Sequence, residues 1–295
     1  MNVLPGLLGL TFAFCIGTAD FISRKSSRAI GPYTTWTYTS MLGTIGLLVL
    51  SPFLSIEVNL TPYLVLVLVL LSVCQFMAGV LVYRAYEYGV FSILAPIVYS
   101  YPVVTILLAV TLLGQVLVPA QILALAATLA GVILLTTRIS DIKENLRGKK
   151  MSVIVPGVGA AIIGTTFFGF NFFGLGIAVP ATGAIFPVLF SRAASFVLGF
   201  ALAPILKQDV KPERRKISRF VITIAVLQVI GTLAFNFGIV FAGGALPIVT
   251  AMSGVGAAFV VGYATVLLRE EPEKIQVLGI LLAIAGVVTL LYLTP

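Results

Sequence analysis

In a chain whose residues are 60% hydrophobic and 9% charged, two opposite charges lie inside long apolar stretches. Asp20 stands late in the first stretch, and Arg192 lies within the stretch near 180–206. An ionisable group inside a membrane is costly, so such residues usually face the interior of a helix bundle. Asp20 could face a binding cavity, or it could pair near the membrane surface with Arg24, four residues further on. Arg192 could hold the carboxylate of a ligand, or it could bond a carbonyl or extend toward the membrane surface.

Amide and tyrosine side chains form stripes at helical spacing in two further apolar stretches. One stripe comprises Gln75, Gly79, Tyr83 and Tyr86, and the other comprises Gln228, Thr232 and Asn236. Amides in hydrocarbon must find hydrogen-bond partners, either on a neighbouring helix or on a polar ligand. Because the two stretches occupy equivalent places in the two halves of the chain, we expect the stripes to face one shared cavity.

Aromatic residues accompany these polar groups. Phe167 and Asn171 stand four residues apart, so they share a helix face that suits an amphipathic ligand, and Tyr99 is a third tyrosine of the candidate lining. Most of the phenylalanines around Phe167 could equally be membrane-facing filler.

Glycines and prolines interrupt two apolar stretches at matching places in the two halves. Proline removes a backbone hydrogen bond, and the freed carbonyls are tolerated where protein or a water-filled cavity satisfies them. Paired interruptions of this kind point to a transport site, although small kinks without ligand contact are the alternative. The predicted hinge or kink residues are Gly89, Pro96, Pro102, Pro247 and Gly254.

These residue types exclude several classes of chemistry. The chain has no histidine, no phosphate-binding loop and no cysteine pair at metal-binding spacing, so we predict that it is not an enzyme and holds no cofactor or metal. The net charge of +8 does not indicate nucleic-acid binding, because the basic residues stand in short loops between apolar stretches, as expected at a lipid surface.

The elements that must position these residues are membrane-spanning helices. A span needs about 20 apolar residues, and the sequence predicts an all-α integral membrane protein with ten transmembrane helices. The predicted spans are 4–23, 33–53, 61–83, 90–113, 119–137, 151–174, 180–206, 219–241, 245–268 and 273–293. Turn residues at the joins, Pro180 among them, support these boundaries.

The basic residues predict the orientation of these spans. Of the 18 Lys and Arg residues, 17 fall in the odd-numbered loops, and the remaining one is Arg192. By the positive-inside rule the odd-numbered loops are cytoplasmic and both termini lie outside. We expect a multi-pass protein of the plasma membrane whose partners are the lipid bilayer and a small-molecule substrate, and which is a monomer or a homodimer.

The chain also repeats itself. Gln121-x-Leu123 followed by Ala130-Gly131-Val132 recurs as Gln276-x-Leu278 followed by Ala285-Gly286-Val287. This repeat predicts two five-helix units, 1–140 and 151–295, joined by a linker at 141–150. Because five is an odd number, the second unit enters the membrane with inverted orientation, and inverted repeats around a central cavity are typical of transporters.

The chain resembles the drug/metabolite transporter superfamily in its EamA-type ten-span branch. Phe14–Lys25 resembles the first-span signature of the family, Tyr83–Pro96 resembles its span 3–4 junction, and Ala234–Glu270 resembles the same region of the second half. Two features depart from the family: Gln115 follows Gly114 where Glu is frequent, and no Trp stands near Ile16. The resemblance implies a basket of helices around a central cavity, with spans 5 and 10 at its edge, and export or exchange of small metabolites, typically amino acids.

We therefore predict a secondary transporter that works by alternating access on a small neutral or zwitterionic metabolite. Strongly anionic ligands need several Lys or Arg, and multivalent cations need several carboxylates, which the candidate lining lacks. An exporter of hydrophobic drug-like compounds is the alternative substrate class. A channel would need a ring of repeated charges or carbonyls, and an integral membrane enzyme would need interfacial carboxylates or histidines.

Overall fold

The computed structural model describes residues 3–51, 60–88, 91–137, 139–140, 151–210, 214–268 and 273–293, which form α-helices joined by turns with no strand among them. The helices up to the middle of the chain are α1 (Leu4–Ile30), α2 (Pro32–Leu50), α3 (Pro62–Tyr88), α4 (Phe91–Val98), α5 (Tyr101–Leu112) and α6 (Pro119–Thr136). Those after it are α8 (Met151–Thr182), α9 (Phe186–Leu202), α10 (Arg214–Phe241), α11 (Leu246–Gly254), α12 (Gly256–Leu268) and α13 (Lys274–Leu293).

Most of these helices have the length and composition of membrane spans. Within the described residues, seven helical stretches are long and apolar enough to cross a membrane, and α9 and α13 are shorter apolar helices. Helix α2 is richer in threonine, and its buried hydroxyls at Thr37 and Thr44 donate to the carbonyl four residues earlier. A backbone acceptor on the same helix lets such a side chain lie in an apolar bundle. The structure thus has the helical content of a multi-pass membrane protein.

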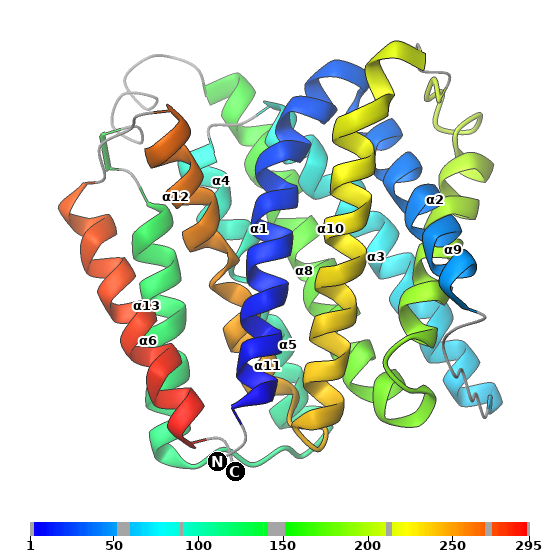
Figure 1. The fold of residues 1–295 in the computed structure, drawn as a ribbon. Helices are drawn as coiled ribbons and strands as arrows, with labels where there is room; N and C mark the ends of the chain where they lie inside the picture. Colours follow the sequence, from blue (N-terminus) through cyan, green and yellow to red (C-terminus); the bar gives the residue numbers. More distant parts are fainter. Residues whose placement is uncertain are drawn as a thin grey trace.

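The helices stand side by side, and both termini lie at the same end of the bundle (Figure 1). The closest neighbours form pairs: α1 with α10, α3 with α8, α6 with α13, and α2 with α9. The pair α6–α13 lies at one edge of the bundle and α2–α9 at the other (Figure 1). Between these edges, α1, α3, α8 and α10 surround the interior together with the broken helices α4–α5 and α11–α12.

Small residues let α1 approach the broken helix α11–α12 closely. A Cβ atom at Gly17 would lie 2.5 Å from the carbonyl oxygen of Gly256, and one at Gly9 would meet the side chains of α11. Ala13 and Asp20 are buried with them, so this face of α1 packs inward. Apolar side chains are equally well solvated by lipid, so close van der Waals contact of this kind is a main source of helix association in a membrane.

Two helices are interrupted near their middles. Helix α4 ends at Val98, and α5 starts three residues later, at Tyr101, with Pro102 in its first turn. Helix α11 ends at Gly254, and α12 starts at Gly256. The interruptions pack against each other, since a Cβ atom at Gly254 would lie 3.1 Å from the ring of Pro102.

The prolines differ in how they relate to these interruptions. Pro96 lies inside α4, whereas Pro247 lies in the first turn of α11, where the first N–H groups have no partner within the helix and a missing one leaves no hydrogen bond unmade. The boundary predicted at Pro180 is wrong: α8 continues through it to Thr182, and the chain turns at Gly183, whose φ of +77° suits a residue without a Cβ atom. The predicted hinge Gly89 and the predicted linker 141–150 lie outside the described residues.

Candidate functional site

A cavity lies in the middle of the bundle, where α1, α2, α3, α8, α9 and α10 meet the interruption between α4 and α5. It encloses about 50 Å³, which is room for a few water molecules. The lining residues are Phe12, Ile16, Asp20, Trp36, Gln75, Tyr83, Val98, Tyr99, Tyr101, Phe168, Asn171, Phe172, Arg192, Gln228 and Thr232. Seven of the ten substrate-binding residues predicted from sequence are in this set; Tyr86, Phe167 and Asn236 are not.

Asp20 presents a carboxylate to the cavity and is held by two tyrosines. Tyr99 donates to Oδ2 at 2.9 Å and Tyr86 donates to the same oxygen at 3.2 Å, so Tyr86 supports the site without lining it. Tyr99 stands at the interruption between α4 and α5, so the carboxylate of α1 is tied to the broken helix.

Arg192 belongs to a hydrogen-bonded chain that crosses three helices. It is 2% exposed on α9, and its Nη1 donates to Gln228 Oε1 on α10 at 2.7 Å. Gln228 Nε2 in turn donates to the hydroxyl of Tyr83 on α3 at 2.7 Å. Arg192 Nε has no hydrogen-bond partner among the described residues, so one donor of the guanidinium is left over in a buried position.

Trp36 is a lining residue that the sequence reasoning missed. Its indole lies under the Arg192 guanidinium, 5.7 Å from ring centroid to Cζ, and meets the Tyr83 ring edge to face at 5.4 Å. Gly79 on α3 makes the space, because a Cβ atom there would overlap the indole. The Trp36 Nε1 donor is buried and has no partner among the described residues. A glycine one turn from Gln75 in the polar stripe of α3 was a sequence signal that a large ring must pack there.

The amides of α3 and α8 meet across the cavity. Asn171 Nδ2 donates to the Leu71 carbonyl at 2.8 Å and makes a longer contact of 3.4 Å to Gln75 Oε1. The first bond attaches Asn171 to α3 as interhelical support, while Gln75 retains its amide nitrogen as a possible donor toward the cavity. Both residues line the cavity as the sequence predicts.

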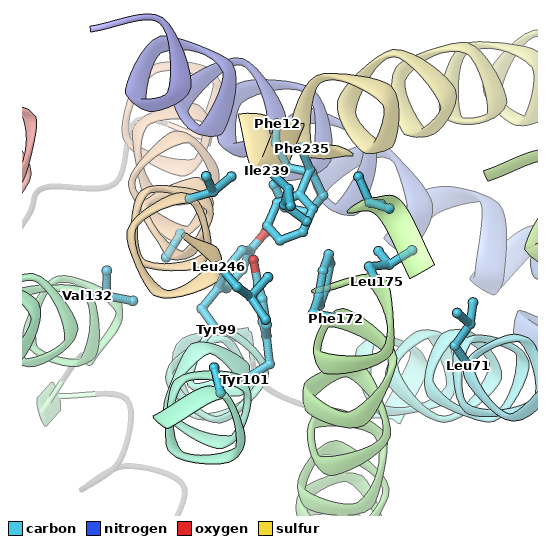
Figure 2. Close-up of a cluster of buried hydrophobic side chains, with 14 of the residues drawn as sticks. Phe12, Leu71, Tyr99, Tyr101, Val132, Phe172, Leu175, Phe235, Ile239 and Leu246 are labelled. Atoms are coloured by element: carbon cyan, nitrogen blue, oxygen red, sulfur yellow. The ribbon is translucent and has the colours of Figure 1, made fainter. Parts of the chain in front are cut away.

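Aromatic rings close the side of the cavity that lies toward the N-terminus of α1. Phe12, Phe172 and Phe235 form a mutual cluster with ring centroids 4.7 to 5.5 Å apart, and Tyr101 stacks on Phe172 at 4.8 Å. Figure 2 shows these rings converging from separate helices, with Tyr99 beside them. The rings offer apolar surface to a ligand next to the polar groups.

Three predicted residues lie elsewhere. Phe168, one position after Phe167, takes the place in the lining, because residues three and four before Asn171 share its helix face and packing chooses between them. Asn236 is fully buried, and its Nδ2 donates to the Ala184 carbonyl in the turn between α8 and α9 at 2.8 Å, as expected for an interhelical contact. Tyr86 acts through Asp20, as described above.

The second interruption joins the same network. Tyr101 and Ser253 approach to 2.6 Å between their hydroxyl oxygens, and Ser253 donates its proton to the Thr250 carbonyl, so Tyr101 is the donor of the pair. Both broken helices therefore contact the cavity or its wall. No group of three metal-ligating side chains occurs among the described residues. The arrangement is one for binding: a carboxylate, a guanidinium, amides and an aromatic wall around one small space.

Comparison with known proteins agrees with this arrangement. Residues 4–137 match the family model described as "EamA-like transporter family". No curated protein matches the chain. A solved structure described as "Crystal structure of protein" has a TM-score of 0.73 and 17% sequence identity, and the match covers 98% of each chain, which shows a shared fold. The family match agrees, over residues 4–137, with the resemblance found from the sequence: the first half of the chain is similar to the EamA-like transporter family.

Proposed function

We propose that this protein is a secondary transporter that moves a small neutral or zwitterionic metabolite, such as an amino acid, by alternating access. The observation that supports it most is the central cavity, which gathers one carboxylate, one guanidinium and several amides beside an aromatic wall. A single charge of each sign suits neither a sugar phosphate nor a multivalent cation. Export as the direction rests on the family resemblance alone.

Ten spans in two inverted five-helix units, 1–140 and 151–295, are part of the proposal. Helix pairings support the inversion: if the order of helices in one half is matched to the other, α1 corresponds to α8 and α3 to α10, and the pairs α1–α10 and α3–α8 exchange with each other. The glutamines of the sequence repeat also exchange. Gln121 at the start of α6 donates to the Leu293 carbonyl at the end of α13, and Gln276 at the start of α13 donates to the Leu135 carbonyl at the end of α6.

Alternating access follows from the size of the cavity and from what surrounds it. Sites for small molecules measure about 300–1,000 Å³, several times the 50 Å³ enclosed here, so a ligand enters only if helices separate. The interrupted helices α4–α5 and α11–α12 stand where such movement would concentrate, because the regular helix is broken in the middle of each. In this proposal the two halves rock about the cavity and open it to one side at a time.

We place the protein in the plasma membrane, as a monomer or homodimer, with both termini outside. Cysteines introduced at positions 2 and 294 of intact cells should react with an impermeant maleimide, and one at position 145 should react only after the membrane is opened. Labelling of position 145 alone in intact cells would reverse the orientation.

The transport proposal is tested in proteoliposomes. Uptake of labelled neutral amino acids should saturate and should be inhibited by unlabelled apolar amino acids. Inhibition by a sugar phosphate but by no neutral amino acid would refute the substrate class. Export of a hydrophobic drug-like compound is the second candidate, favoured by the rings of Phe12, Phe168 and Phe172, and it predicts competition by aromatic cations and no competition by amino acids.

A further inference from the structure

The cavity contains two opposite charges whose hydrogen-bond partners among the described residues are neutral side chains. Among the described residues, Asp20 receives hydrogen bonds from the neutral hydroxyls of Tyr86 and Tyr99, and Arg192 donates to the neutral amide of Gln228. Asp20 is 7% exposed and Arg192 is 2% exposed. Buried charges are normally paired, because an isolated charge in a low-dielectric interior is very costly. The neutral partners of these two charges therefore require a reason.

Tyr83 lines the cavity together with both charges. Its hydroxyl accepts from Gln228, which binds Arg192. The charges come from opposite halves of the chain, since Asp20 is on α1 and Arg192 on α9. A molecule that carries both signs and fits between them would satisfy both charges at once.

The basic end has the donors that a carboxylate requires. Arg192 Nε is a buried donor without a protein partner, and so is Trp36 Nε1, on the ring that stacks against the same guanidinium. Charge-assisted hydrogen bonds from arginine to a carboxylate are about twice as strong as neutral ones. Two leftover donors in one buried place are rare in native structures, and each therefore points to a missing acceptor.

The acidic end has the acceptor that an ammonium requires. Both tyrosine hydroxyls donate to Oδ2 of Asp20, and no described residue donates to Oδ1. Because Asp20 lines the cavity, Oδ1 is the acceptor toward which a further donor can add.

We propose that the cavity recognises free amino acids by both charged ends: the ammonium binds Asp20, and the carboxylate binds Arg192 with help from Trp36. The side chain then faces the aromatic wall of Phe12, Phe168 and Phe172. Because the bound molecule bridges α1 and α9, its two ends hold the two halves of the protein together. This inference rests on the proposed transport function, and it makes a stricter claim, since amines, carboxylic acids and blocked amino acids are excluded as good ligands.

The experiment uses three forms of one ligand and needs no variant to begin. Proteoliposomes with the full-length protein take up labelled L-leucine or L-phenylalanine, and the competitors are the same free amino acid, its carboxamide and its N-acetyl derivative. Each blocked form loses one charge-assisted contact, so each should compete about 10- to 100-fold more weakly than the free amino acid. If the blocked forms compete as well as the free one while uptake is saturable, this inference is wrong and the transport proposal stands. If no amino acid is taken up saturably, the transport proposal itself fails.

Variants of Asp20 and Arg192 then test which residue binds the ammonium of the ligand and which binds its carboxylate. Asp20→Asn should weaken the free amino acid and reduce its advantage over the N-acetyl form to within about threefold, while its advantage over the carboxamide remains. Arg192→Gln should reduce the advantage of the free amino acid over the carboxamide, while its advantage over the N-acetyl form remains. Trp36→Phe, which keeps the aromatic character but removes the indole N–H, should reduce the advantage over the carboxamide less strongly. The exposed residues Asp209 and Arg28 provide controls of equal charge change, Asp209→Asn and Arg28→Gln, which should alter neither ratio. If Asp20→Asn and Arg192→Gln, with wild-type thermal stability, weaken all three forms equally, the assignment of the ends is overturned. If either variant fails to fold, the wild-type analogue series and Trp36→Phe decide.

Discussion

Two pairs of glutamines lie in the apolar helices of this protein, and their surroundings differ. At the edge of the bundle, Gln121 Oε1 accepts from the Val118 N–H at 3.1 Å and Gln276 Oε1 accepts from the Glu273 N–H at 2.9 Å. Their amide nitrogens reach carbonyls of the opposite helix, at 3.2 and 3.0 Å. Each side chain thus caps its own helix and fastens it to its antiparallel neighbour through backbone groups.

In the cavity, the other pair contacts side chains. Gln228 lies between Arg192 and Tyr83, at 2.7 Å from each, and Gln75 has one long contact with Asn171. Unpartnered donors lie next to this pair, on Arg192 and on the indole of Trp36. The edge pair has no comparable leftover group among the described residues of α6 and α13.

The surroundings of the two glutamine pairs distinguish structural from functional polar residues in a membrane bundle. Both pairs are buried glutamines in helices of the same fold, so residue type and depth do not distinguish them. The hydrogen bonds around them distinguish the two pairs. Where backbone groups satisfy every polar atom of the side chain, the residue supports helix packing. Where hydrogen-bond donors remain without a partner, a ligand can accept from them.

The largest loss of stability is expected at the edge of the bundle, where helices α6 and α13 touch through glycines. A Cβ atom at Gly279 would overlap the backbone of Leu135, so Gly279→Leu forces the helices apart and should destabilise the fold by about 3 kcal/mol. The thermal unfolding temperature in detergent measures this. Gly262→Leu is the matched control, since a Cβ atom there meets nothing within 4 Å, and its unfolding temperature should remain near that of the wild type. An equal loss in both variants would contradict the close packing of α6 on α13.

The next effect is expected in the cavity. Gln228→Glu places a carboxylate of nearly the same shape against Arg192, which forms an internal ion pair and occupies the guanidinium. We expect saturable uptake to fall by at least about tenfold, the equivalent of 1.4 kcal/mol, while the unfolding temperature is kept. Gln276→Glu at the edge makes the same chemical change and should leave uptake unaltered. Normal uptake by Gln228→Glu would show that the guanidinium takes no part in binding.

The sequence was informative about the fold because helix formation in a membrane depends on local composition. Long apolar runs located the membrane helices. The boundary at Pro180 was wrong because a proline can lie within a helix, and only Gly183, with its positive φ, turns the chain. The stripes of Gln75 and Tyr83 on α3 and of Gln228 on α10, found from helical spacing, contain residues that line the cavity.

The other differences between the predicted residues and the cavity lining come from what helical spacing leaves undetermined. Trp36 was missed because α2 carries threonines on every side and shows no polar stripe, so only its contact with Gly79 reveals its role. Asn236 was placed in the cavity because it continues the stripe of Gln228, but eight residues of helix advance about 12 Å, far enough to leave the cavity and reach the turn after α8. Spacing gives the face of a helix, and depth along the bundle requires the structure.

The third prediction concerns Asn236 and tests whether this residue lies beyond the cavity along the axis of the bundle. Asn236→Leu removes the hydrogen bond to the Ala184 carbonyl and should lower the unfolding free energy by about 1–2 kcal/mol, with the affinity for amino acids unchanged. Gln75→Leu, in the cavity lining, should weaken binding and have a smaller effect on stability. A change in affinity in Asn236→Leu at wild-type stability would return this residue to the binding site.

The smallest effect is expected from Gln121→Leu. The substitution removes a cap from the Val118 N–H and a donor from the Leu293 carbonyl, and leucine then fills the same space between α6 and α13. Hydrogen bonds between membrane helices contribute about 0.6 kcal/mol on average, so the unfolding temperature should fall slightly and uptake should not change. The double variant Gln121→Leu, Gln276→Leu should show the sum of two such losses, because the two bonds lie at opposite ends of the pair. If either single variant changed the affinity or the rate of uptake without changing stability, helices α6 and α13 would take part in transport. A polar side chain whose hydrogen bonds are all satisfied would then no longer indicate a purely structural role.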